Sequence, residues 1–132
     1  MGLDKTVTIT EGGESGVYGA SVTVEDSDCG CQTFSGQGSS LPNSPVRHNT
    51  VASGTYSGTN TTMKKGKPGI YIGDTPTEPG SPKPTAEEIF VHCGFTSTDR
   101  GSRGCPTIQP DQCAEFFRQF GREEPVTVII NH

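Results

Sequence analysis

The chain has 132 residues, with 10 Lys and Arg against 15 Asp and Glu, and its formal net charge is −5. This length fits a single domain, which we place over residues 1–132. The acidic balance, without a basic stripe or interleaved aromatic residues, argues against nucleic-acid binding. No apolar run approaches the roughly 20 residues that cross a bilayer, so we expect no membrane span.

Hydrophobic residues make up only 29 % of the chain, while glycine and proline contribute 18 and 10 residues. The low apolar fraction predicts a small core. Frequent glycine and proline favour short strands joined by turns over a helical bundle. We therefore predict a mainly β fold, either a β-sandwich or an open barrel of short strands, with one α-helix.

Alternation of apolar and polar residues predicts the strands. In chain order they cover residues 5–10, 17–24, 31–34, 51–56, 69–72, 86–92 and 125–130. Residues 35–49 and 74–84 are rich in Gly, Ser, Asn or Pro, and we interpret both as surface loops. We expect the basic cluster of Lys64, Lys65 and Lys67 to lie at a solvated hairpin tip.

The segment 110–120 is the one good helix in the sequence. Pro110 suits the first helical position, and Asp111 suits the positive end of the helix dipole. Gly121 is well placed as the residue that ends the helix. Positions i, i+3, i+4 and i+7 form one apolar face, which consists of Cys113, Phe116, Phe117 and Phe120.

An apolar, β-rich stretch ends at His92, and Cys105 follows thirteen residues later. A cysteine is a strong nucleophile only as thiolate, so a cysteine enzyme needs a nearby base or positive charge. Strand alternation places His92 on the opposite face from Val91 and Cys93, which we expect to face the core. We infer that Cys105 is the nucleophile and that His92 is its base.

Gly104 immediately precedes Cys105 and allows a close approach of the backbone. The amides of Gly104 and Cys105 can point at one spot. Two such amides would form an oxyanion hole, which stabilises the tetrahedral intermediate of acyl transfer.

The order of His92, a variable loop and Ser102-Arg103-Gly104-Cys105 resembles the signature of the L,D-transpeptidase catalytic domain, the YkuD-type family. That signature is a histidine, a loop, and then Ser/Thr-x-Gly-Cys. A helix and a closing strand follow, as in the family, and Gly54-Thr55-Tyr56 is similar to its Gly-x-aromatic strand. The resemblance covers residues 50–131 and is closest to small members found as delivered antibacterial effectors or in phage.

The resemblance implies roles for two residues beside the catalytic pair. Ser102 would support the turn before the nucleophile by a hydrogen bond. The backbone carbonyl of Cys93 would orient the imidazole, although the family usually has a glycine directly after this histidine.

The chain also departs from the family after the nucleophile, where Pro106 and Thr107 replace an aliphatic residue and an arginine. That arginine is associated with holding the substrate or the loop. Arg103 and Arg100 are candidates to take over this substrate-binding role. Tyr56 and Tyr71 are further substrate-binding candidates, because they can line the groove.

The resemblance implies that Cys105 attacks the bond between a diamino acid and D-alanine in a peptidoglycan stem tetrapeptide. D-alanine leaves, and a thioester acyl-enzyme remains. An amine acceptor then gives a cross-link or an exchanged D-amino acid, whereas water gives carboxypeptidase activity. This chemistry needs no metal and no cofactor. The expected partners are peptidoglycan stem peptides and, for a delivered toxin, an immunity or delivery protein.

The N-terminus has no charged region followed by an apolar core, so we expect no cleavable signal peptide. We predict that the protein is made in the cytoplasm. It would act in the periplasm or on the cell wall after delivery by a secretion system, such as type VI, or by a phage.

Five cysteines leave at least one outside any internal pairing scheme. Cys29 and Cys31 are too close to pair comfortably with each other, and a bond from either to another cysteine stays open. Cys113 is most simply a core residue or the partner of another cysteine, and Cys93 is more simply core than ligand.

Two other functions stay open at this point. The first is a non-catalytic structural or wall-binding component of a phage or secretion apparatus with the same fold, which the missing arginine favours. The second is a zinc-stabilised binding module that would use Cys29 and Cys31 with His92, Cys93 and Cys105.

Overall fold

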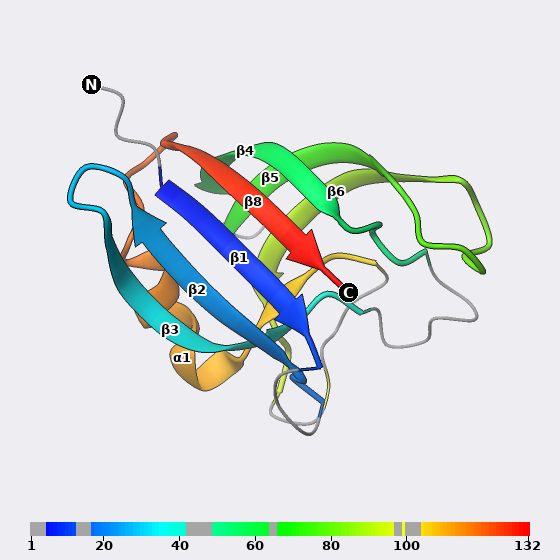
Figure 1. The fold of residues 1–132 in the computed structure, drawn as a ribbon, viewed down its shortest axis with the longest axis horizontal. Helices are drawn as coiled ribbons and strands as arrows, with labels where there is room; N and C mark the ends of the chain where they lie inside the picture. The colour runs from blue at the N-terminus through cyan, green and yellow to red at the C-terminus, as the bar shows by residue number, and fades with distance from the viewer. Residues whose placement is uncertain (1–4, 13–16, 42–48, 64–65, 97–98, 100–103) are drawn as a thin grey trace.

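A computed structural model of the chain describes residues 5–12, 17–41, 49–63, 66–96, 99 and 104–132. Within these ranges, eight strands form a closed barrel with one short helix beside it (Figure 1). The mainly β fold with one helix is thus confirmed, and the barrel is closed rather than open. The elements are β1 (Lys5–Glu11), β2 (Ala20–Asp26), β3 (Cys31–Ser39), β4 (Gly54–Thr62), β5 (Pro68–Pro76), β6 (Thr85–Cys93), β7 (Thr107–Ile108), α1 (Pro110–Phe117) and β8 (Pro125–Asn131).

The strand order around the barrel is β1-β2-β3-β7-β6-β5-β4-β8, with β8 returning to β1. Neighbouring strands are antiparallel except for two pairs, β1 with β8 and β6 with β7. The short β7 closes the gap between β3 and β6. Because Pro106 alone separates Cys105 from β7, this closure brings the predicted nucleophile close to the strand that carries His92.

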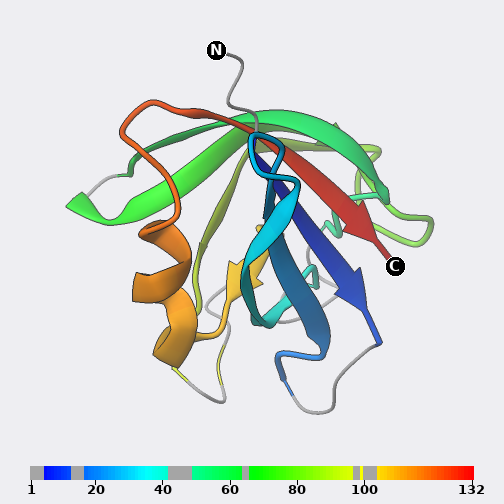
Figure 2. The same cartoon turned by 60° about the vertical axis from the view of Figure 1, so that its left-hand side comes forward.

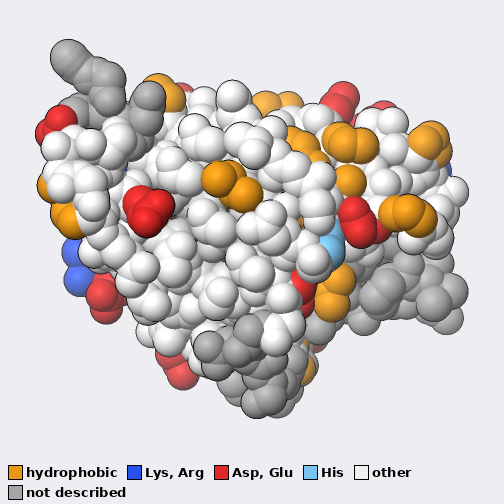
Figure 3. Space-filling model, in the orientation of Figure 1, with side chains coloured by type: hydrophobic (Ala, Val, Ile, Leu, Met, Phe, Trp, Pro, Cys, Tyr) orange, Lys and Arg blue, Asp and Glu red, His pale blue; other side chains and the backbone are white. Residues whose placement is uncertain are grey.

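Strand alternation builds the small core inside the barrel. Val7 and Ile9 of β1 are fully buried, whereas Thr8 between them lies at intermediate depth. On β8, Val128 and Ile130 are likewise fully buried. The face seen in Figure 3 is mostly neutral, with acidic and hydrophobic groups scattered over it. The low apolar content is sufficient to build this core, because nearly every strand contributes one face of apolar side chains to the inside of the barrel.

The helix α1 packs on β3 and β7 and closes the core on that side (Figure 2). Phe116 is fully buried, and its ring lies 5.4 Å from that of Phe34 and 5.3 Å from that of Phe120. The helix ends at Phe117, three residues before the predicted end. Gly121 does not end the helix; its amide instead donates a hydrogen bond to the Glu124 carboxylate at 2.7 Å.

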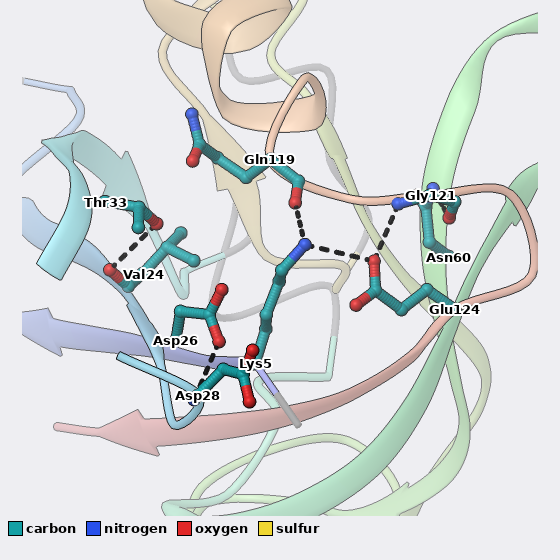
Figure 4. Close-up of polar contacts among 9 residues, drawn as sticks. All are labelled: Lys5, Val24, Asp26, Asp28, Thr33, Asn60, Gln119, Gly121 and Glu124. Atoms are coloured by element: carbon teal, nitrogen blue, oxygen red, sulfur yellow. Dashed lines mark hydrogen bonds and ion pairs between the residues drawn. The ribbon is translucent and has the colours of Figure 1, made fainter. Parts of the chain in front are cut away.

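Lys5 ties the first strand to the connection between α1 and β8 (Figure 4). Its ammonium donates to the Gln119 carbonyl at 2.5 Å and lies 3.3 Å from a Glu124 carboxylate oxygen. The same Glu124 oxygen accepts the Gly121 amide, and the Asn60 side-chain amide donates to the Gly121 carbonyl at 2.8 Å. These contacts fix the end of the barrel where β8 begins.

Two predicted loops are partly strand. β3 continues through residues 35–39, and β5 continues through residues 74–76. In β3 the glycines allow close packing, because a Cβ at Gly38 would lie 2.9 Å from Val22 Cγ2. Local composition predicts loops at such glycines, although here they let neighbouring elements approach.

In the described part of the chain, no helix has the length and apolarity needed to span a membrane.

Candidate active site

His92 is the second-last residue of β6, as the sequence predicts. Val91 is fully buried, and the neighbouring Phe90 and His92 are half-buried on the other face. The Phe90 ring packs against Tyr71 of β5, with ring centroids 5.0 Å apart. The alternation of β6 therefore presents the imidazole on the outer face of the barrel.

The imidazole of His92 is fixed by its own backbone neighbour. Nδ1 lies 2.8 Å from the carbonyl oxygen of Cys93. Because a carbonyl only accepts hydrogen bonds, Nδ1 carries the proton in this contact. Nε2 is then the unprotonated nitrogen of the neutral ring. This carbonyl occupies the orienting position that the family resemblance implies.

The pKa of His92 lies below its ordinary value of 6.5. Burial is the main cause, because it disfavours the charged imidazolium. The hydrogen bond to the Cys93 carbonyl raises the pKa, and the positive charge of Lys67 lowers it further. At neutral pH the ring is therefore neutral, and Nε2 can accept a proton.

Cys105 reaches this region through the pairing of β6 with β7. The His92 amide donates to the Pro106 carbonyl at 3.1 Å, and His92 pairs with Thr107. The Cys105 thiol is hydrogen-bonded to the backbone of Phe90. In a strand, residues two apart direct their amides to the same side, so both contacts lie along the β7 edge of β6. The sequence separation of thirteen residues is thus bridged by strand pairing.

The Cys105 thiol is half-buried, and all five cysteines lie in the described residues, where Cys105 alone is outside a disulfide. Burial raises its pKa, and the hydrogen bond to the Phe90 backbone offsets part of that rise. At neutral pH the resting group is therefore a thiol. Cys105 and His92 are therefore both uncharged in the resting state, in contrast to a preformed thiolate–imidazolium ion pair.

Gly104 adopts a backbone conformation that favours glycine, with φ of +145°. A Cβ at this position would lie 2.8 Å from the Asn49 carbonyl oxygen. The residue before Cys105 must therefore be glycine for two independent reasons, conformation and space. The oxyanion role of the Gly104 and Cys105 amides stays a prediction.

Tyr18 anchors the segment that follows β6, and the sequence analysis missed it. Its hydroxyl donates to the Thr96 carbonyl at 2.7 Å and lies 3.2 Å from that of Asp99. The ring fills the space beside Gly94, where any side chain would collide with the hydroxyl. Nothing in the local pattern signals a contact across 78 residues of sequence.

We expect Tyr18→Phe to loosen this segment without unfolding the barrel. The ring keeps its packing, whereas the Thr96 carbonyl loses a neutral hydrogen bond, which is worth about 1 kcal/mol. Amide hydrogen exchange should therefore rise at residues 94–96 and stay unchanged in β1 and β8. Equal exchange in the variant and the native protein would contradict an anchoring role.

A cavity of about 500 Å³ opens beside the imidazole. Gly69 of β5 pairs directly with His92, and the Met63 side chain occupies the space that a side chain at position 69 would take. Met63 lies over Gly69, since a Cβ there would be 2.7 Å from Met63 Cγ. The described residues that line the cavity are Met63, Lys67, Pro68, His92, Cys93, Gly94 and Phe95.

The other predicted site residues have different outcomes. Ser102, Arg100 and Arg103 lie outside the described residues. Tyr71 is 40 % exposed and stacks beside Phe90, so it flanks the site. Tyr56 lies elsewhere, and its hydroxyl donates to the Ala52 carbonyl at 2.6 Å. It is five residues along β4 from Thr61, which pairs with Gly69 on the adjacent strand β5. At strand spacing this is roughly 16 Å, so Tyr56 does not line the cavity.

The disulfides correct one prediction and extend another. Cys29 and Cys31, which we expected not to pair, bond to each other in the exposed turn between β2 and β3. A second bond joins Cys93, the last residue of β6, to the buried Cys113 of α1. Cys93 therefore faces the core side, as alternation predicts, while its carbonyl holds His92.

Among the described residues, no group of three or more His, Cys, Asp or Glu side chains could hold a metal ion. The zinc hypothesis also requires the thiols of Cys29, Cys31, Cys93 and Cys105. The first three are in disulfides, and the Cys105 thiol is hydrogen-bonded to the backbone of Phe90. Comparisons of the chain with protein-family models, with curated proteins and with solved structures found no match.

Proposed function

We propose that this protein is a cysteine-dependent acyltransferase that acts on peptidoglycan stem tetrapeptides. One observation carries the proposal: the Cys93 carbonyl holds the His92 ring in the tautomer whose Nε2 is a base, and the pairing of β6 with β7 brings the segment that contains Cys105 alongside His92. The substrate class comes from the sequence resemblance around these same residues.

The uncharged resting pair defines how the reaction would begin. His92 Nε2 takes the thiol proton as the sulfur attacks the carbonyl carbon of the diamino acid. The tetrahedral intermediate collapses, the C–N bond breaks, and the same nitrogen returns the proton to the amine of the departing D-alanine. The products are a thioester on Cys105 and free D-alanine. Water or an amine then attacks the thioester and restores the thiol.

Intact-protein mass spectrometry with a stem tetrapeptide tests this proposal. We expect release of D-alanine and an adduct on the protein equal to the tripeptide minus water, both absent from Cys105→Ala. The control is Cys29→Ala/Cys31→Ala, which removes the other exposed sulfur atoms and should keep both signals. If the native protein, with its disulfides intact, releases no D-alanine, the acyltransferase proposal is wrong.

A non-catalytic wall-binding role is the second candidate. It is favoured by Pro106 and Thr107, which stand where the family has an aliphatic residue and an arginine. The raised pKa of Cys105 points in the same direction, because it lowers the thiolate fraction. Binding of the tetrapeptide to native protein without any D-alanine release would support this role.

A further inference from the structure

We propose that the cavity beside His92 is the leaving-group subsite, and that the Lys67 ammonium binds the free terminal carboxylate of the substrate there. This inference rests on the proposed function, and it assigns a recognition residue in place of the arginine that the chain lacks. Three features of the cavity, as the described residues define it, support this inference. They are its position relative to His92, the charge of its lining and the apolar part of its lining.

The position of the cavity relative to the two catalytic groups comes from the strand order. β6 lies between β7 and β5 in the barrel. Cys105 contacts the β7 edge of β6, at Phe90. The cavity runs from the end of β6, at Cys93, Gly94 and Phe95, to Met63, Lys67 and Pro68 at the start of β5. The imidazole therefore stands between the thiol and the Lys67 end of the cavity.

The mechanism determines which part of the substrate occupies that cavity. His92 gives its proton to the departing amine, so this amine must lie within hydrogen-bond reach of the imidazole. The acyl part remains bonded to Cys105 on the β7 side. The leaving amino acid must then extend away from the thiol, into the cavity over β5. This amino acid ends in a carboxylate.

The charges of the cavity match such a group. Lys67 is the one charged side chain among the described residues that line it. Within the described part of the chain its ammonium has no hydrogen bond or ion pair, whereas that of Lys5 is paired with Glu124. It acts on the imidazole, whose pKa it lowers. In a chain of net charge −5, a cation directed at this site favours an anionic ligand.

The rest of the lining suits the hydrocarbon part of an amino acid. Met63 and Phe95 provide apolar surface, and Phe95 is 71 % exposed. A volume of about 500 Å³ is in the range of small-molecule sites and exceeds what the methyl group of alanine fills. The subsite would therefore also accept larger apolar amino acids that carry a free carboxylate.

The same site would select the acceptor. An incoming amine donates its proton to His92 as its nitrogen attacks the thioester carbonyl, the C–S bond breaks, and the proton returns to the sulfur. By microscopic reversibility, this amine occupies the position of the departing one. An amino acid with a free carboxylate is then a better acceptor than its amide.

Binding to the full-length Cys105→Ala protein tests the assignment without turnover. Calorimetry would compare a stem tetrapeptide with its C-terminal amide. We expect the acid to bind about tenfold more tightly, the value of one charge-assisted hydrogen bond. Lys67→Met should abolish this preference, and Lys67→Arg should retain it. Lys83→Met, at another exposed lysine, is the matched control and should change nothing.

The outcomes separate this inference from the proposed function. If acid and amide bind equally, or if Lys67→Met leaves the preference intact, the subsite assignment is wrong, even if Cys105-dependent release of D-alanine occurs. If the preference depends on Lys67 but no D-alanine is released, carboxylate recognition stands and the acyl-transfer chemistry is wrong. Loss of the preference in Lys83→Met would also overturn the assignment, because the effect would then follow net charge.

Discussion

Replacing His92 with glutamine is expected to lower the rate of D-alanine release by roughly 10²–10⁴-fold, the usual contribution of a general base. Glutamine keeps a hydrogen-bonding side chain of similar reach but cannot take up the thiol proton. The distinctive expectation concerns the thiol itself. Because the resting pair is uncharged, alkylation of Cys105 by iodoacetamide at pH 7 should be slow in the native protein and nearly unchanged in His92→Gln.

A preformed ion pair would behave differently. In that case the imidazolium would stabilise the thiolate, and His92→Gln would slow alkylation strongly. Met63→Leu serves as the matched control, because it changes a neighbour of the imidazole without removing a titrating group. A large drop in alkylation with His92→Gln alone would therefore contradict the uncharged resting state inferred from the two pKa shifts.

The pH dependence of D-alanine release follows from the same shifts. The base works when neutral, and the pKa of His92 lies below 6.5, so the rate should rise with pH through that lowered value. The raised pKa of Cys105 adds no falling limb near neutrality, because the thiol is the reacting form. A rate–pH profile is expected to rise below pH 6.5 and then stay level through neutral pH. A bell-shaped profile would instead indicate an ion pair.

The fold could be predicted from the sequence where the periodicity of the apolar residues is strong. The alternation of β1, β2 and β8 and the aromatic stripe of α1 were sufficient to locate those elements. Closure of the barrel was not predictable, because it depends on β7, a strand of two residues with no pattern of its own. The glycines of β3 misled the prediction for a related reason: only the packed structure reveals what approaches them.

In the candidate site, local sequence signals predicted some residues, whereas others were revealed only by contacts between segments that are distant in the sequence. His92, Gly104 and Cys105 carried a recognisable order in the sequence. Tyr18 and Gly69 carried none, because each acts by supporting or making room for a residue far along the chain. Lys67 was interpreted as a solvated lysine, which its exposure still supports, and only the cavity gives it a candidate role.

Removing the Cys93–Cys113 disulfide, by Cys93→Ala/Cys113→Ala, should lower the free energy of unfolding by about 3 kcal/mol, the value for a loop of this size. The two cysteines are 20 residues apart, and the bond joins the end of β6 to α1. Urea unfolding monitored by circular dichroism measures the loss. The native state should persist, because Phe116 and its aromatic neighbours still hold the helix.

The same variant tests whether this bond supports the catalytic geometry. The Cys93 carbonyl orients His92, so freedom at residue 93 should misplace Nε2 and reduce D-alanine release by roughly ten- to a hundredfold. Cys29→Ala/Cys31→Ala is the control: it breaks a bond that spans two residues in an exposed turn and should leave the rate unchanged. Equal rates of D-alanine release in both double variants would show that the Cys93–Cys113 disulfide does not support the catalytic geometry. A loss confined to Cys93→Ala/Cys113→Ala would mean that an oxidising compartment is required for full activity, because only there does this bond persist.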